Sequence, residues 1–187
     1  MNVYTYDFPE DHPEKLIGVY DKASGDSPHD LKVFGYKESW RPPALHFTVP
    51  ASRLDPVPAT NLPVHVFRDD LASEIARIDG DEVVIIPLRV TAAKEEINGF
   101  SIVHPHRKVA IWDLEKSKWR GLGGPDWPKD QPMFMQDMVL KDKIEEFKVA
   151  YNRQWSSMLL FNEAVASTIR VSRSWVKVFI PQHYRND

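Results

Sequence analysis

The sequence contains no cysteine. A disulfide framework, a thiolate nucleophile and a cysteine-based zinc site are therefore excluded, and a reducing compartment suits the composition. Long apolar runs are also missing: the longest are about half a dozen residues, against the roughly 20 that span a bilayer. The first residues show neither the basic segment nor the apolar segment of a secretory signal. We therefore expect a cytoplasmic protein without a membrane segment.

Blocks of basic residues are absent as well. The 187 residues carry 24 basic and 27 acidic side chains, for a net charge of −3. Binding to nucleic acid through several phosphates needs clustered positive charge, so we expect no nucleic-acid partner. The hydrophobic share of 42% is enough for a packed core and excludes a disordered chain.

What the sequence does contain is a pattern that occurs twice, 94 positions apart, over residues 64–87 and 158–181. Each copy predicts a short apolar approach, one amphipathic helix and a buried strand stopped by proline. We predict that Ile75 and Ile169 occupy equivalent buried positions on the two helices. The identical pairs are Phe67 and Phe161, Ala72 and Ala166, Ser73 and Ser167, Ile75 and Ile169, Val84 and Val178, Ile86 and Ile180, and Pro87 and Pro181.

Proline is concentrated in the first part of the chain. Residues 1–60 hold eight of the 15 prolines, and each removes a backbone donor and restricts φ. We predict an irregular arm with edge strands near residues 3–6 and 45–49, wrapped around a core formed by residues 61–187. The two parts are expected to form one compact domain.

Between the two copies the pattern changes to short strands. Residues 99–103 and 109–112 predict a hairpin or meander. Residues 133–140 alternate like another strand, and residues 141–148 have a helix-prone composition. The predicted fold class is α+β, with a central β-meander or sheet flanked by two similar helix-plus-strand units and a Pro-rich irregular N-terminal arm.

The best candidate for a metal site is His104-Pro105-His106, because alternate residues of an extended stretch share a face. His46 or Asp113 would have to join the two imidazoles to complete a ligand set. No second ligand pair accompanies them, and Pro105 favours a turn. We therefore interpret His104 and His106 as surface-loop histidines and predict no bound metal.

Other sequence features give no catalytic constellation. Neighbouring carboxylates point apart on a helix or strand, so consecutive acids do not form an acid/base dyad. Gly121 to Pro125 lacks the lysine–hydroxyl ending of a phosphate loop. We therefore predict a protein that is not an enzyme and needs no cofactor. The consecutive acids are Asp69 and Asp70, Glu95 and Glu96, and Glu145 and Glu146.

Tryptophan and arginine on irregular segments are typical of protein-binding hot spots. Trp40 and Arg41 lie in the Pro-rich arm, and Trp119, Arg120 and Trp127 lie in or beside a glycine-rich loop. The alternative is that these rings attach long loops to the core. The five residues are our candidates for a partner-binding surface.

The stretch from Val109 to Ser117 combines an apolar strand with Asp113-Leu114-Glu115-Lys116-Ser117. It resembles the strand and Asp-x-Glu-Lys-Ser segment of immunity protein eleven, a family first defined on myxobacterial sequences. The order of flanking elements is similar over roughly residues 62–180. Members of this family belong to bacterial polymorphic toxin systems, where each neutralises a cognate toxin. The resemblance implies a protein that binds a toxin and covers its active site or locks its conformation.

The residues of this family motif are Asp113, Glu115, Lys116 and Ser117. Asp113 or Ser117 can cap a turn that leaves a buried strand, through hydrogen bonds from side chain to backbone. We therefore expect the motif to serve the fold and the binding surface to lie elsewhere.

Three hypotheses for function follow. The first is an immunity protein whose partner is a protein toxin, and the second is a structural or adaptor binding module. The third is a His-dependent metal hydrolase, for which His104, His106 and an acid would have to converge. A toxin-like reading frame beside the gene separates the first hypothesis from the other two.

Overall fold

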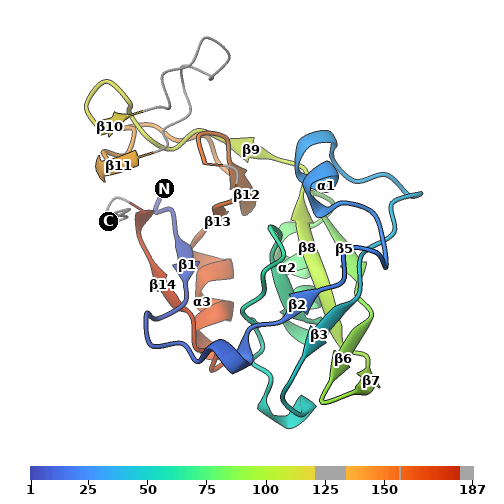
Figure 1. Cartoon of the computed structure of the whole chain (residues 1–187). Helices are drawn as coiled ribbons and strands as arrows, with labels where there is room; N and C mark the ends of the chain where they lie inside the picture. The colour runs from blue at the N-terminus through green and yellow to red at the C-terminus, as the bar shows by residue number, and fades with distance from the viewer. Residues whose placement is uncertain (121–133, 156, 182–187) are drawn as a thin grey trace.

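The computed structural model describes residues 1–120, 134–155 and 157–181. These residues form short helices and several small sheets, so the α+β class predicted from the sequence is confirmed (Figure 1). The longest described helix is α2 (Asp69–Asp79), with 11 residues. In the described parts of the chain, no helix combines the length and apolar character needed to cross a membrane.

In the first copy of the repeated pattern, α2 connects two strands of one sheet. β4 (Val66–Arg68) leads directly into α2, and β5 (Val83–Pro87) follows it. β8 (Phe100–Pro105) lies between these two strands and is antiparallel to both. α2 ends at Gly80, whose φ of 74° lies in the left-handed region that glycine adopts without strain.

The second copy has the same arrangement. β13 (Leu159–Phe161) leads into α3 (Glu163–Val171), and β14 (Lys177–Phe179) follows. β1 (Thr5–Asp7) is antiparallel to β14, and an antiparallel bridge joins the residue before β1 to the end of β13. In each copy, therefore, the helix connects two strands along the chain. A third strand, antiparallel to its neighbours, lies between these two strands in space.

The separating strand comes from different parts of the chain in the two copies. β8 follows the first copy, whereas β1 comes from the N-terminus and lies beside the C-terminal strand β14 (Figure 1). The prediction of an edge strand at residues 3–6 agrees with β1, which forms a two-stranded sheet with β14. On its other side, Tyr4, the residue before β1, forms a single bridge to Phe161 of β13.

The two helices contact each other and share one hydrophobic core. Ile75 is 0% exposed and Ile169 is 1% exposed, and both belong to this core together with Phe67 and Phe161. Equivalent residues of the two copies are therefore buried in one cluster.

A second core joins the β4–β8–β5 sheet to a four-stranded sheet. Along β8, Ile102 packs in this second core and Val103 packs in the first, as alternation along a strand requires. α1 (Pro28–Phe34) contributes the buried Leu31. The strands of the four-stranded sheet are, in order, β2 (Val19–Tyr20), β3 (Leu45–Phe47), β6 (Val90–Ala92) and β7 (Glu95–Ile97). β3 pairs with both β2 and β6, so the prediction that the strand at residues 45–49 lies at an edge is wrong.

A third core contains Trp112, which is fully buried. The side-chain amide of Gln154 satisfies both backbone groups of Trp112: it accepts from the Trp112 N–H at 2.8 Å and donates to the Trp112 carbonyl at 2.9 Å. The strands around this core are β9 (Lys108–Val109), β12 (Val149–Asn152), β13, β10 (Lys118–Arg120) and β11 (Phe134–Asp137).

The first sixty residues contribute side chains to all three cores. Tyr4 lies in the first core, Phe47 in the second and Val3 in the third. Short 3₁₀ turns, Glu14–Leu16 and Ala51–Arg53, interrupt the irregular stretches. The Pro-rich segment is therefore built into the packing of the described chain.

Two local predictions are wrong. The hairpin between residues 99–103 and 109–112 does not form, because β8 pairs with β4 and β5 while β9 runs parallel to β12. Residues 141–148 form no helix. There the Lys141 N–H donates to the Ile111 carbonyl at 2.9 Å, and Phe147 is buried in the third core. These tertiary contacts outweigh a weak helix propensity.

The equivalence of the two helices can be measured. Ile75→Ala and Ile169→Ala each leave a cavity in the same core and should lower the free energy of unfolding by roughly 2–5 kcal/mol. Denaturant melts give the values. Alanine at Val171, which is 77% exposed, is the matched control and should change stability by less than about 0.5 kcal/mol. A similarly small loss at either isoleucine contradicts the equivalence.

Candidate functional site

The two candidates in the Pro-rich arm have different environments. Trp40 packs against the second core, and its indole Nε1 donates to the Ser27 carbonyl at 3.2 Å. The Arg41 side chain is 80% exposed and lies 3.7 Å from the Asp26 carboxylate. Trp40 therefore attaches the arm to the core, and Arg41 is the more available of the two for a partner.

The candidates in the glycine-rich region are only partly described. Trp119 on β10 packs against the third core, and its Nε1 donates to the Leu114 carbonyl at 2.9 Å. Arg120 is exposed at the end of the same strand. Trp127 lies outside the described residues. Trp119 is therefore attached to the fold in the same manner as Trp40.

The family motif forms a tight turn. Oδ1 of Asp113 accepts hydrogen bonds from the backbone N–H of Glu115 at 3.2 Å and of Lys116 at 3.3 Å. The Ser117 hydroxyl donates to the Asp113 carbonyl at 2.6 Å and accepts from the Val139 N–H at 2.9 Å. The hydrogen bond and charge of the Lys116 ammonium lower the pKa of the Asp113 carboxyl. Asp113 and Ser117 thus make local bonds that hold the turn together.

The two candidate metal ligands lie in different environments. His104 is buried on β8, and its Nδ1 lies 3.4 Å from the Tyr151 hydroxyl, whereas His106 is exposed. The interpretation of His104 as a surface-loop residue is therefore wrong. Among the described residues, no three side chains of histidine, aspartate or glutamate converge on a metal position, so neither His46 nor Asp113 completes a ligand set.

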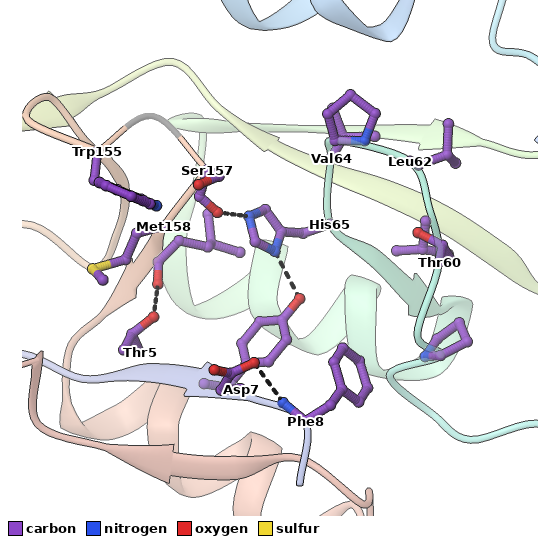
Figure 2. A pocket seen from close by; sticks show the side chains of 15 residues that line it. Thr5, Asp7, Phe8, Thr60, Leu62, Val64, His65, Trp155, Ser157 and Met158 are labelled. Carbon is purple, nitrogen blue, oxygen red and sulfur yellow. Dashed lines mark hydrogen bonds between the residues drawn. The ribbon is translucent and has the colours of Figure 1, made fainter. Parts of the chain in front are cut away.

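A cleft lies elsewhere in the described structure. It has a volume of about 260 Å³ and opens between β1, residues 58–66, Trp155 and residues 157–159 (Figure 2). Phe8, Trp155 and Met158 provide apolar walls. The backbone segments that surround it come from three distant parts of the chain.

A hydrogen-bond chain crosses this cleft. The His65 Nε2 lies 3.0 Å from the Ser157 carbonyl, and its Nδ1 lies 2.7 Å from the Tyr6 hydroxyl (Figure 2). A carbonyl can only accept, so Nε2 carries the proton in the tautomer that fits these distances, and Nδ1 of that tautomer accepts from Tyr6. Burial, with smaller contributions from the charges of Tyr151 and Asp7, raises the pKa of Tyr6, so its hydroxyl remains a neutral donor. The chain fixes the orientation of both rings.

Aromatic rings continue from the cleft to the surface. Ring centroids are separated by 5.5 Å between His65 and Tyr6, 6.1 Å between Tyr6 and Phe8, 5.1 Å between Phe8 and His12, and 5.7 Å between His12 and Trp175. All four pairs have edge-on geometry, which is the favourable arrangement for aromatic rings. Trp175 is 52% exposed at the end of this row.

Sequence analysis did not identify the cleft. Tyr6 was visible only as part of an alternating strand, and His65 only as part of the approach to a helix. The two residues meet because β1 pairs with the C-terminal strand β14, and no local pattern in the sequence encodes that pairing. Trp175, which lies between Ser174 and Val176, was not among the candidates from the sequence.

Comparison with known proteins adds no family assignment. No protein-family model matches the chain, and no curated protein matches it at a significant level. The case for function therefore depends on the residues themselves.

The structural role of the motif can be tested with Ser117→Ala. This change removes the bonds to the Asp113 carbonyl and from the Val139 N–H, and we expect a loss of about 1–3 kcal/mol in the free energy of unfolding. Glu115→Ala is the control within the motif, because Glu115 is exposed and should cost less than about 0.5 kcal/mol. Equal effects of the two changes in chemical melts would show that the motif does not hold the turn.

His104 predicts a dependence of stability on pH. Burial, assisted by the charges of His106 and Lys108, lowers its pKa from 6.5 to about 4. Between these values the unfolded chain binds the proton and the folded chain does not. The free energy of unfolding should therefore fall as the pH drops from 6.5 to 4, by up to ~3 kcal/mol.

In His104→Gln, the fall in the free energy of unfolding between pH 6.5 and 4 should lose the part that is due to His104. In His29→Gln, at an exposed position, the same fall should remain. Melts of the three proteins at several pH values provide the comparison. An unchanged pH profile in His104→Gln would refute the assignment.

Proposed function

We propose that this protein is a cytoplasmic immunity protein that binds a cognate bacterial toxin and neutralises it by covering it. The observation that carries the proposal is the turn formed by Asp113 to Ser117. These residues are the ones through which the chain resembles the immunity protein family, and the side chains of Asp113 and Ser117 bond to the backbone of the turn.

In this proposal, the residues that indicate the family hold the turn together, and other residues contact the partner. It lies directly before β10, which pairs with β11, and its side chains are engaged with neighbouring backbone. Immunity proteins of one family need a common fold and different binding surfaces, because each recognises its own toxin. A motif that serves the fold suits this requirement.

The cleft between β1, residues 58–66, Trp155 and residues 157–159 provides a preformed surface for binding. Tyr6 and His65 are held in place by hydrogen bonds before any partner arrives. A surface that is already ordered loses less conformational entropy on association. Trp175, exposed at the end of the aromatic row, adds the type of side chain that dominates protein interfaces. Inhibition by covering a toxin requires no chemistry from this chain.

The experiment is co-expression with the protein encoded by the adjacent gene. We expect toxicity of that protein to be relieved and a stable complex with one copy of each chain to be recovered by co-purification. Expression with an empty plasmid measures the toxicity itself. Glu95→Lys, at an exposed position on β7 outside the cleft, should protect as well as the unmodified chain.

Toxicity that persists together with absence of a complex would contradict the proposal. A complex without any toxicity of the partner would instead favour an adaptor module, since binding would then have no toxin to neutralise. The two results are distinguished by the growth of cells that express the partner alone.

A further inference from the structure

Three hydrogen-bond donors in the lining of the cleft bond to acceptors of the protein itself. The Thr5 hydroxyl donates to the Leu159 carbonyl at 2.8 Å. The Tyr6 hydroxyl donates to His65 Nδ1 at 2.7 Å, and His65 Nε2 donates to the Ser157 carbonyl at 3.0 Å (Figure 2). These three donors are therefore used within the protein. The Tyr6 hydroxyl and the Ser157 carbonyl each retain a lone pair that can accept from a ligand.

Asp7 adds a negative charge to the lining. One of its carboxylate oxygens accepts from the Phe8 N–H at 2.8 Å, and the other bonds to no residue that the structure describes. The described lining of the cleft includes no lysine and no arginine. Lys177 lies opposite Asp7 in the pairing of β1 with β14, but it does not line the cleft. The cleft therefore contains an anion and no cation.

Aromatic faces complete the lining. Phe8 and Trp155 lie on different sides of the cleft (Figure 2). Cations are attracted to the faces of such rings. The volume of about 260 Å³ is below the range of roughly 300–1,000 Å³ typical of sites for drug-sized ligands. It suits one long side chain better than a cofactor.

We infer that the cleft binds the guanidinium group of an arginine side chain supplied by a partner protein. A guanidinium group has five donors and no acceptor, which complements a site with unused acceptors and a carboxylate. The inference rests on the proposed function only in making the toxin the source of this side chain. It implies that the contacting surface of the toxin is basic.

Charge beside the cleft favours the same type of partner. Glu10, Asp11 and Glu14 are exposed in the segment that follows β1, and the exposed Lys15 follows them, so acids outnumber bases there. None of them forms an ion pair with another described residue. Unpaired surface charges of one sign increase the rate of association with a surface of the opposite sign.

The test uses N-acetyl-arginine amide as the probe and follows the side-chain NMR signals of His65 and Trp155. Titration into the intact protein should shift both signals in a saturable manner. N-acetyl-citrulline amide, which has nearly the same shape without the charge, should produce no saturable shift. Equal responses to the two compounds, or no response to the arginine compound, would overturn the inference.

A pair of variants locates the interaction. Asp7→Asn retains an acceptor for the Phe8 N–H but removes the charge, and it should weaken binding of the arginine probe about two- to fivefold. Asp11→Asn makes the same change outside the lining and should leave the affinity unaltered. Equal affinities of the two variants for the probe would also overturn the inference.

This titration is independent of the toxin. A failure of co-expression to relieve toxicity refutes the proposed function and leaves the response of the cleft to arginine measurable. Conversely, a protective complex whose affinity is unchanged by Asp7→Asn supports the proposed function and contradicts the toxin as the source of the arginine.

Discussion

The pairing of the N-terminal strand with the C-terminal part of the chain is the contact on which the rest of the structure depends. Tyr4 and Phe161 exchange backbone hydrogen bonds of 2.9 and 2.8 Å, and Thr5 pairs with Phe179 on the other side. Without this strand, β13 and β14 would each lose a partner, and backbone groups buried without partners are costly. The first residues of the chain thus complete a unit whose remaining parts are at the other end.

The same pairing creates the cleft. β1 holds Tyr6 and Asp7, and the segment before β4 holds His65, so the two repeated units meet at the Tyr6–His65 hydrogen bond. The Tyr6 side chain therefore links the C-terminal unit to the segment that precedes β4 in the N-terminal unit. Any movement of β1 relative to β4 would alter the cleft, so the shape of the cleft depends on the packing of β1.

Aromatic side chains have two roles in this protein. Trp40 and Trp119 each donate an indole hydrogen bond to the carbonyl of a loop and pack on a core. Trp112 is enclosed completely, with its backbone satisfied by Gln154. Trp175 is different, because its backbone is held by Asp55 at 2.8 Å while its ring is 52% exposed. A tryptophan in an irregular segment can attach a loop or be available to a partner, and only its contacts distinguish the two.

The sequence by itself determined the repeated helix-plus-strand units, the α+β class and the burial of Ile75 and Ile169, because these depend on local periodicity and apolar content. It also indicated a turn at Asp113 to Ser117, where the bonds are made between near neighbours in the chain. Only the tertiary structure decided that β1 and β8 are the separating strands and that residues 141–148 are not helical. The cleft belongs to this second group. Tyr6, His65 and Ser157 are brought together by strand pairing between distant parts of the chain. The partner of a strand depends on which apolar faces remain to be covered, and that is a property of the whole fold.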